Sequence, residues 1–257
     1  DNSGAIDVSG YYAAYGVIAQ SIYGDVSVNN SGSIDVYAGP TGYYAYGVIA
    51  SSYYGNVGVD NSGSITVDGY ANATFGSYAF GVFAESYYGD VDVNNSGSIT
   101  VSASSYSLLP SEATGVYAQS YQGDVSVDNS GSIIVNATSD NVYYGSSATG
   151  VLAYAKYGDV VVTNSGDISA TARSDYFQFY GEATAVGVVA IEIVAYSYYN
   201  GSLTVDNSGS ISAEASAYYG GASATGVYAL TIFGDLYVDN SGSIEASAAS
   251  GDYSDYS

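Results

Sequence analysis

Apolar and polar residues alternate along short stretches of the chain, and the same stretch returns many times. In the copy at residues 123–133, GDVSVDNSGSI, Val125 and Val127 alternate with polar residues, and Ile133 and Val135 resume the alternation after a glycine. A period of two predicts β-strands with one buried face, and β-branched residues favour that conformation. Because helical spacing of apolar residues appears nowhere over a useful length, we expect an all-β protein.

Glycines divide each repeat into units of fixed length. The Asn-Ser-Gly triplet occurs eight times at intervals of roughly 28 to 43 residues, a period typical of solenoids, propellers or arrays. A second glycine lies eight residues before the triplet glycine. A third glycine, in the motif Ala-x-Gly-Val, lies eight residues before the second. The one exception is the interval from Gly187 to Gly201, which contains six extra residues. This spacing predicts three short strands per repeat, joined by tight turns at which glycine supplies a positive φ.

Three strands that repeat in register indicate a parallel β-helix, or β-solenoid, in which each repeat forms one rung and equivalent residues stack about 4.8 Å apart. We expect seven full rungs and one extra strand in a single domain, residues 1–257, with 247–257 as a C-terminal tail. A propeller is the alternative, but its blades need about 40 residues and four strands. Length variation falls in loops at one corner, at 37–46, 68–80, 102–113, 136–148 and 170–186.

The amino-acid composition excludes several classes of function. Lys156 and Arg173 are the only cations, and the net charge of -23 repels nucleic acid and anionic membranes. The absence of Cys, His, Met and Trp excludes disulfides, Cys/His metal sites and histidine-based catalysis. The densest apolar run, 183–195, contains Glu192 and is too short to span a bilayer. We therefore expect no nucleic-acid partner and no membrane insertion.

The asparagine of the Asn-Ser-Gly triplet falls at the same alternating position as the inward valines, so it is expected to point inward in every repeat. Inward asparagines in stacked rungs can hydrogen-bond their own kind above and below, which predicts a structural ladder rather than a ligand site. Its members are Asn2, Asn30, Asn61, Asn95, Asn129, Asn164, Asn207 and Asn240. Asn72 and Asn136 begin Asn-x-Thr sequons on predicted loops and are the glycosylation candidates.

Aromatic and apolar residues form two further columns. The first precedes the turn glycine and is expected to pack between rungs; it contains Tyr23, Tyr54, Tyr88, Tyr157 and Phe233. The second alternates with inward residues and predicts an outward apolar stripe, covered either by the loops or by a neighbouring molecule. It contains Ile18, Ile49, Phe83, Tyr117, Leu152, Val189 and Tyr228.

Aspartates also recur at equivalent positions of successive repeats. Asp90, Asp124 and Asp159 occupy adjacent repeats and should stack outward, where like charges about 5 Å apart repel by nearly 1 kcal/mol even in water. A divalent cation, Ca²⁺ above all, or a low pH would relieve this repulsion, and these three residues are the candidate metal ligands. A solvated acidic face is the alternative, and no other cofactor is expected.

The repeat resembles a known type of surface protein. One copy reads Ala-Thr-Gly-Val-Tyr-Ala at 113–118, followed by Gly-Asp-Val-Ser-Val-Asp-Asn-Ser-Gly-Ser-Ile at 123–133. This pattern is similar to the repeats of autotransporter-type passengers and related bacterial surface proteins. The resemblance covers essentially the whole chain. It implies a right-handed parallel β-helix that is secreted and used in adhesion or surface structure.

Three classes of function remain. The first is a structural or adhesive, extracellular or cell-surface protein that forms a head-to-tail homopolymer, without enzymatic activity; glycans or other surface molecules are expected partners of its loops. The second is a carbohydrate-binding or polysaccharide-processing protein, since glycosidase chemistry needs only two carboxylates, and Glu182, Glu192 and Glu214 are scattered candidates. The third is an ice- or mineral-binding solenoid, which the irregular outward columns disfavour. We expect the first.

Overall fold

The computed structural model describes residues 1–41, 43–72, 76–106, 109–140, 145–174, 181–193, 201–218, 220–232 and 234–251 of the 257-residue chain. Within these ranges the regular elements are the strands β1 to β22. This part of the chain holds no helix long and apolar enough to cross a membrane.

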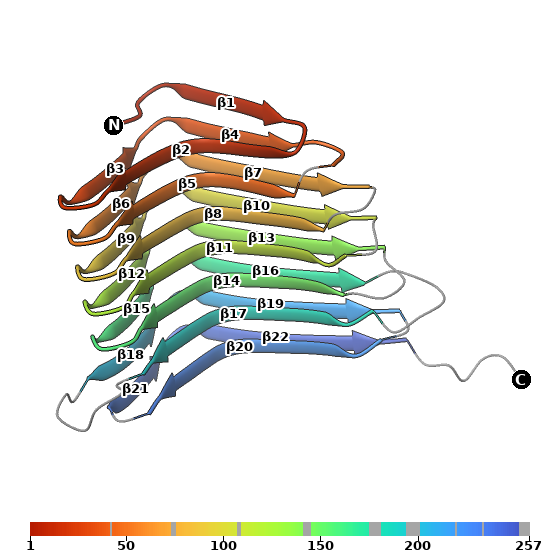
Figure 1. Cartoon of the computed structure of the whole chain (residues 1–257). Coiled ribbons are helices and arrows are strands. Elements are labelled where there is room, and N and C mark those ends of the chain that lie inside the picture. The colour runs from red at the N-terminus through yellow and green to blue at the C-terminus, as the bar shows by residue number, and fades with distance from the viewer. Residues whose placement is uncertain are drawn as a thin grey trace, which may run out of the picture.

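Each strand pairs in parallel with the strand three positions later, which gives three sheets (Figure 1). The β1 sheet contains β1 (Ala5–Gly10), β4 (Ser33–Ala38), β7 (Ser64–Ala71), β10 (Ser98–Ser105), β13 (Ser132–Ser139), β16 (Asp167–Ser174), β19 (Ser210–Ala217) and β22 (Ser243–Ser250). The β2 sheet contains β2 (Ala13–Ser21), β5 (Tyr44–Ser52), β8 (Ser77–Ser86), β11 (Ser111–Ser120), β14 (Ser146–Ala155), β17 (Ala183–Glu192) and β20 (Ala222–Thr231). The β3 sheet contains β3 (Val26–Asn30), β6 (Val57–Asn61), β9 (Val91–Asn95), β12 (Val125–Asn129), β15 (Val160–Asn164), β18 (Ser202–Asn207) and β21 (Asp235–Asn240).

The register places like residues opposite one another. Ile99 lies opposite Ile133, and Val101 lies opposite Val135. The fixed glycine spacing keeps every strand in phase, so a one-residue slip would turn the inward valines and isoleucines to solvent. The predicted β-solenoid with three parallel strands per rung is confirmed.

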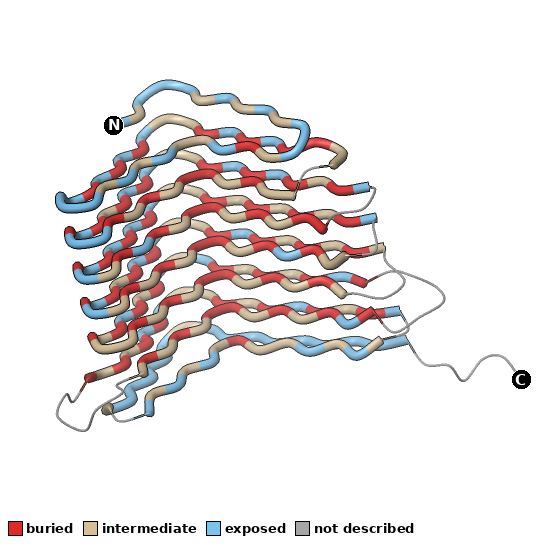
Figure 2. Tube along the Cα trace, viewed as in Figure 1, coloured by how far each residue is buried: buried red, intermediate tan, exposed pale blue. Residues whose placement is uncertain are grey.

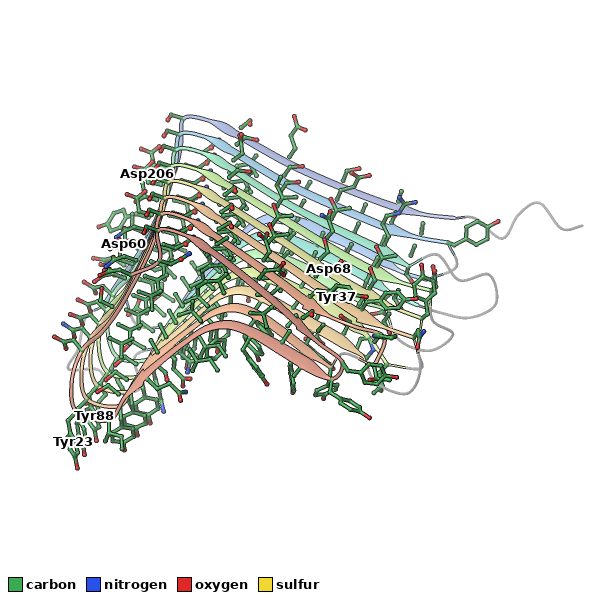
Figure 3. The ribbon with its side chains drawn as sticks, turned by 90° about the horizontal axis from the view of Figure 1, so that it is seen from above. Tyr23, Tyr37, Asp60, Asp68, Tyr88 and Asp206 are labelled. Carbon is green, nitrogen blue, oxygen red and sulfur yellow. The ribbon has the colours of Figure 1, made fainter. Side chains whose placement is uncertain are left out.

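Viewed from above, the cross-section has two arms, because the β2 sheet bends halfway along its strands (Figure 3). At the bend Gly115 and Val116 are buried in succession, which breaks the alternation of the strand. A Cβ on Gly115 would lie 2.4 Å from Cγ2 of Ile133 and 2.5 Å from the carbonyl oxygen of Gly150. The missing side chain therefore lets the β1 sheet approach the bend.

The buried apolar residues of the three sheets form one continuous core along the stack (Figure 2). Inward residues of the β1 sheet become smaller away from the Asn-Ser-Gly corner, as in Ile99, Val101, Ala103 and Ser105, all at most 1% exposed. Small residues face one another at the far end of this arm: a Cβ on Gly69, the equivalent of Ala103, would lie 3.6 Å from the Cβ of Ala79 and 3.8 Å from the Cβ of Ala45. The packing of such a core depends on the size of each side chain.

The predicted role of the corner glycines is wrong. No described glycine has a positive φ. Close stacking explains them instead: a Cβ on Gly131 would lie 2.0 Å from the carbonyl oxygen of Gly97, and one on Gly123 would lie 2.4 Å from that of Gly89. Distances below 3.0 Å are not tolerated, so glycine is needed because the backbone of the next rung occupies the space of a side chain.

The predicted loops are too long. Strands β10, β13 and β16 continue into segments that the composition assigned to loops, because their alanines and serines keep the alternation of buried and outward residues. Asn136, predicted on a loop, lies within β13 and is half-buried on its outer side, whereas Asn72 follows β7 and is exposed. The strands of the β1 sheet all end at one corner, from which the connections of variable length were expected to leave (Figure 1).

Candidate functional site: side-chain columns and open terminal rungs

The eight triplet asparagines lie in one column at the corner between the β3 and β1 sheets. In all of them except Asn240, Nδ2 donates to the Oδ1 of the asparagine in the next rung, over 2.6 to 2.8 Å. Asn129 is 1% exposed, and its carbonyl oxygen accepts the N–H groups of Ser165 and Gly166 at 2.8 and 3.1 Å. The column therefore holds successive rungs together from within.

The predicted metal ligands cap backbone groups. Oδ1 of Asp90 accepts the N–H of Asp124 at 3.0 Å, and Oδ1 of Asp124 accepts that of Asp159 at 2.8 Å. Oδ1 of Asp159 in turn accepts the N–H of Ser202 at 2.7 Å. Across the described residues no three His, Cys, Asp or Glu side chains are grouped to hold a metal ion. Calcium binding by these residues stays a prediction.

A second acidic column carries asparagines between its carboxylates. Nδ2 of Asn94 donates to Oδ1 of Asp60 at 2.8 Å, and Nδ2 of Asn29 donates to Oδ1 of Asp1 at 2.8 Å. A neutral donor between two rungs replaces a like-charge contact by a charge-assisted hydrogen bond. This alternation lets an acidic solenoid stack its rungs.

A buried serine column closes the turns between the β2 and β3 sheets. The Oγ of Ser120 donates to the carbonyl oxygen of Gly89 and accepts the N–H of Gly123, both at 2.8 Å. Ser52 and Ser86 bond in the same way in their own rungs. The serine thereby links its own turn to the turn of the preceding rung.

Glu192 ends β17 in this same column, where its carboxyl is fully buried. Oε2 accepts the hydroxyl of Thr231 at 2.7 Å, whereas Oε1 has no hydrogen-bond partner. Desolvation raises the pKa of Glu192, and the charge of Asp159 adds to this effect. Glu182 and Glu214 are exposed, the latter on the outer side of β19. Burial therefore keeps Glu192 from sharing a surface site with them.

Tyrosines stack in two parallel rows at the turn that leads from the β2 sheet to the β3 sheet. Tyr23, Tyr54 and Tyr88 form part of the predicted row, with ring centroids 5.4 and 5.0 Å apart, whereas Tyr157 meets Tyr121 edge to face at 5.5 Å. Phe233, assigned to this row, lies outside the described residues. A second row, which was not predicted, contains Tyr53, Tyr87 and Tyr121, whose ring centroids are 4.9 and 4.5 Å apart. The repeated Tyr-Tyr dipeptide before the turn glycine was the available signal.

A lysine ends the second row. Nζ of Lys156 lies 4.1 Å from the ring centroid of Tyr121 and donates to its hydroxyl at 2.6 Å. The ring of Tyr157 lies 5.3 Å from the same nitrogen. The hydrogen bond between the two side chains raises the pKa of Lys156 and lowers the pKa of Tyr121. An ammonium group is thus held against the tyrosine row.

The predicted outward apolar stripe lies inside the bend of the β2 sheet. Phe83 stacks on Tyr117 with centroids 4.7 Å apart, and it meets Tyr46 and Phe80 of the other arm edge to face at 6.0 Å. Burial raises the pKa of Tyr46 and of Tyr117, so both phenols stay protonated at neutral pH. Rings of the opposite arm therefore partly cover Phe83 and Tyr117, whereas Ile18 and Tyr228, at the two ends of the stripe, are 54% and 48% exposed.

The rung formed by β20, β21 and β22 exposes residues that are interior elsewhere. Leu236, Val238 and Ile244 are 45%, 51% and 37% exposed, whereas their equivalents one rung earlier, Leu203, Val205 and Ile211, are at most 1% exposed. Among the described residues each of these three strands is the last of its sheet, so within this part of the chain no strand pairs with its outer row of backbone N–H and C=O groups. Figure 2 shows the change from buried to exposed at this end.

Comparison of the chain with protein-family models, with curated proteins and with solved structures finds no match.

Proposed function

We propose that this protein is a structural, extracellular or cell-surface protein that assembles end to end into a homopolymeric filament. The observation that carries the proposal is the open rung formed by β20, β21 and β22. Apolar area that leaves water contributes about 25 cal/mol per Å², so covering Leu236, Val238 and Ile244 with another rung favours association. The resemblance of the repeat to bacterial surface proteins supports the location.

The opposite end of the stack offers a matching surface. Strand β1 is the first strand of the β1 sheet, and its inward residues Ile6 and Val8 are partly exposed. Continuing the register of the β1 sheet across a junction places Ile244 of β22 opposite Ile6 of the next copy, and Ala246 opposite Val8. The two ends are different surfaces, so their contact is heterologous and propagates as a filament unless it closes into a ring.

The strand count shapes the junction. The β1 sheet has eight described strands and each of the other two sheets has seven. Two stacked copies therefore meet first through β22 and β1, which leaves one strand position in each of the other sheets to be filled. Either a rotation between copies offsets the surplus strand, or residues at the junction, within 1–8 and 241–257, cross over and complete the partner's rung.

Analytical ultracentrifugation and negative-stain imaging across a wide protein concentration test the proposal. We expect the 257-residue chain to form concentration-dependent filaments, and deletion of Asp1 to Val8 to abolish them while the β-rich circular dichroism persists. A monomer at all concentrations, with or without Ca²⁺, would refute the proposal.

A pair of substitutions distinguishes the end-to-end contact from non-specific association. Val238→Asp places a charge on the open interior surface, whereas Tyr237→Asp places the same charge on the outer side of the same strand. We expect Val238→Asp to prevent filament formation and Tyr237→Asp to leave it intact. Equal effects of the two substitutions would contradict an end-to-end junction.

A further inference from the structure

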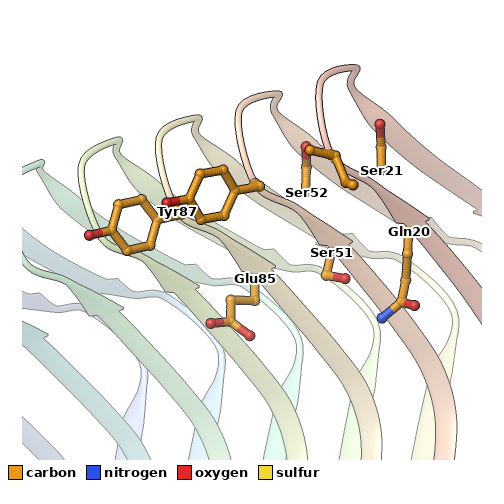
Figure 4. A pocket seen from close by; sticks show the side chains of 8 residues that line it. Gln20, Ser21, Ser51, Ser52, Glu85 and Tyr87 are labelled. Carbon is orange, nitrogen blue, oxygen red and sulfur yellow. The ribbon is translucent and has the colours of Figure 1, made fainter.

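A hollow of about 520 Å³ lies on the β2 sheet beside the turns that carry the tyrosine rows. Its floor is formed by Gln20, Ser51 and Glu85, which occupy equivalent outward positions near the ends of β2, β5 and β8. Its wall comes from the following turns, with the rings of Tyr53 and Tyr87. Figure 4 shows Glu85, Ser51 and Gln20 in a row across adjacent strands, with Tyr87 at the turn. This volume is in the range of small-ligand sites.

The chemistry of the hollow favours a cation. Glu85 supplies an exposed carboxylate, and no basic residue lines the hollow. The rings of Tyr53 and Tyr87 are stacked with centroids 4.9 Å apart at 14°, and Tyr53 is 44% exposed. An ammonium group beside a carboxylate and a tyrosine ring gains both Coulomb and cation–π attraction. A chain with net charge -23 repels an anion from the same place.

The protein itself places an ammonium group against the same row of rings. Lys156 occupies the position that Tyr121, Tyr87 and Tyr53 hold in preceding rungs, and its Nζ turns back onto the Tyr121 ring at 4.1 Å. Its hydrogen bond to the Tyr121 hydroxyl is 2.6 Å long. This contact lies along the row from the hollow and shows which group these rings accept.

We propose that the hollow binds a lysine side chain of a basic polypeptide. The alkylammonium group lies against the rings of Tyr53 and Tyr87, and Glu85 accepts its hydrogen bond. The partner is a different protein rather than a second copy, because Lys156 is the only lysine of this chain and is already held by Tyr121. Charge complementarity selects a lysine-rich segment.

Isothermal titration calorimetry of the purified chain with acetyl-tetralysine amide, at about 150 mM salt, tests this site. We expect saturable binding that Glu85→Gln and Tyr87→Leu each weaken about three- to fivefold. Tyr87→Phe keeps the ring and should change the affinity less than about twofold. Asp206→Asn removes one charge at a distant corner and should also change it less than about twofold, because salt screens charges beyond about a Debye length. Circular dichroism checks that each variant is folded.

Modified peptides test the cation directly. Trimethylation of the lysines keeps the charge but removes the N–H donors to Glu85, so binding should weaken no more than about three- to fivefold, as for Glu85→Gln. Acetylation removes the charge and should abolish binding. Equal weakening by Glu85→Gln and Asp206→Asn would show diffuse attraction to an acidic surface and overturn the proposal. Undiminished binding by Tyr87→Leu or of the acetylated peptide, or the absence of saturable binding, would overturn it too.

Discussion

The side-chain amide of Asn129 donates to Asn164 and accepts from Asn95, at 2.7 Å in both cases. Removing it leaves the Nδ2 of Asn95 and the Oδ1 of Asn164 without these partners inside a buried column. Each unsatisfied buried group costs about 1–3 kcal/mol. Partners on both sides therefore tie the stability of three rungs to one side chain.

We expect Asn129→Ala to lower the free energy of unfolding by about 2–4 kcal/mol. Asp128→Ala, at the neighbouring exposed position of the same strand, should change it by less than about 0.5 kcal/mol. Urea denaturation followed by circular dichroism measures both. Equal effects would mean that the amide column contributes no more than an outward residue.

Two buried serines at opposite ends of β11 allow a hydrogen-bonded hydroxyl to be compared with one that has no hydrogen-bond partner. Both are fully buried, but the Oγ of Ser120 makes two hydrogen bonds and the Oγ of Ser111 makes none. Ser120→Ala should destabilise by about 1–3 kcal/mol, whereas Ser111→Ala should be neutral or stabilising, because it removes an unpaired polar atom. Ala183 and Ala222 fill equivalent positions two and three rungs later, so alanine fits there. A larger loss of melting temperature for Ser111→Ala than for Ser120→Ala would contradict this reasoning.

At the scale of an element, the bend of each β2-sheet strand depends on one glycine. The bend lets a single strand face both of the other sheets, and it creates the concave face on which the aromatic rings of the two arms meet. Sheet curvature of this kind is commonly produced at glycines where another segment approaches closely.

We expect Gly115→Ala to cost about 3 kcal/mol or more, since the new methyl group would overlap Cγ2 of Ile133 and the carbonyl oxygen of Gly150. Gly58→Ala is the matched control: Gly58 lies in β6 with no atom within 4 Å of an added Cβ. That change should be neutral or stabilising by about 0.5–1 kcal/mol, because it restricts the unfolded chain. Thermal unfolding compares the two, and a tolerated Gly115→Ala would mean that the bend does not need glycine.

At the scale of the whole molecule, acidic charge sets the response to pH. Partial desolvation raises the pKa of Asp68, Asp92 and Glu112, and neighbouring aspartates add to the shift of Asp92. Desolvation also raises the pKa of the buried Glu192. A carboxyl with a raised folded-state pKa binds its proton more tightly in the folded state. Folding stability therefore falls as the pH rises through that pKa and is regained on acidification.

We expect the melting temperature to increase as the pH is lowered from about 7.5 to about 5, which is still above the reference carboxyl pKa near 4. Glu192→Gln should raise the melting temperature at pH 7.5 and reduce its slope with pH, because the amide has no charge to desolvate. A melting temperature that falls steadily between these pH values would contradict the expectation.

Charge also bears on assembly. The register that places Ile244 opposite Ile6 places Glu245 opposite Asp7 of the next copy. If copies join end to end, Glu245→Lys exchanges a like-charge contact for an opposite-charge contact and should lower the protein concentration needed for filaments about five- to tenfold. Glu214→Lys, on the outer side of a strand inside the stack, is the control and should have little effect. Sedimentation over a concentration series measures both, and equal shifts would argue against this register.

The sequence by itself determined the strands, their number per rung, their stacking and the asparagine column. These features repeat at fixed spacing, and a period of two within units bounded by glycine leaves one strand register that buries Val125, Val127 and Ile133. Local alternation and the repeat length are properties of the chain, so they can be read without coordinates.

Only the tertiary structure decided the purpose of the glycines, the length of the strands, the bend and the second tyrosine row. Each depends on how closely segments from different rungs or sheets approach. Gly123 is needed because the backbone of Gly89 is near, and Ala103 belongs to a strand because it is buried between the sheets at a position where a small residue fits. Sequence spacing carries no such distance between segments. The concave face and the tyrosine-lined hollow therefore became visible only when the rungs were stacked.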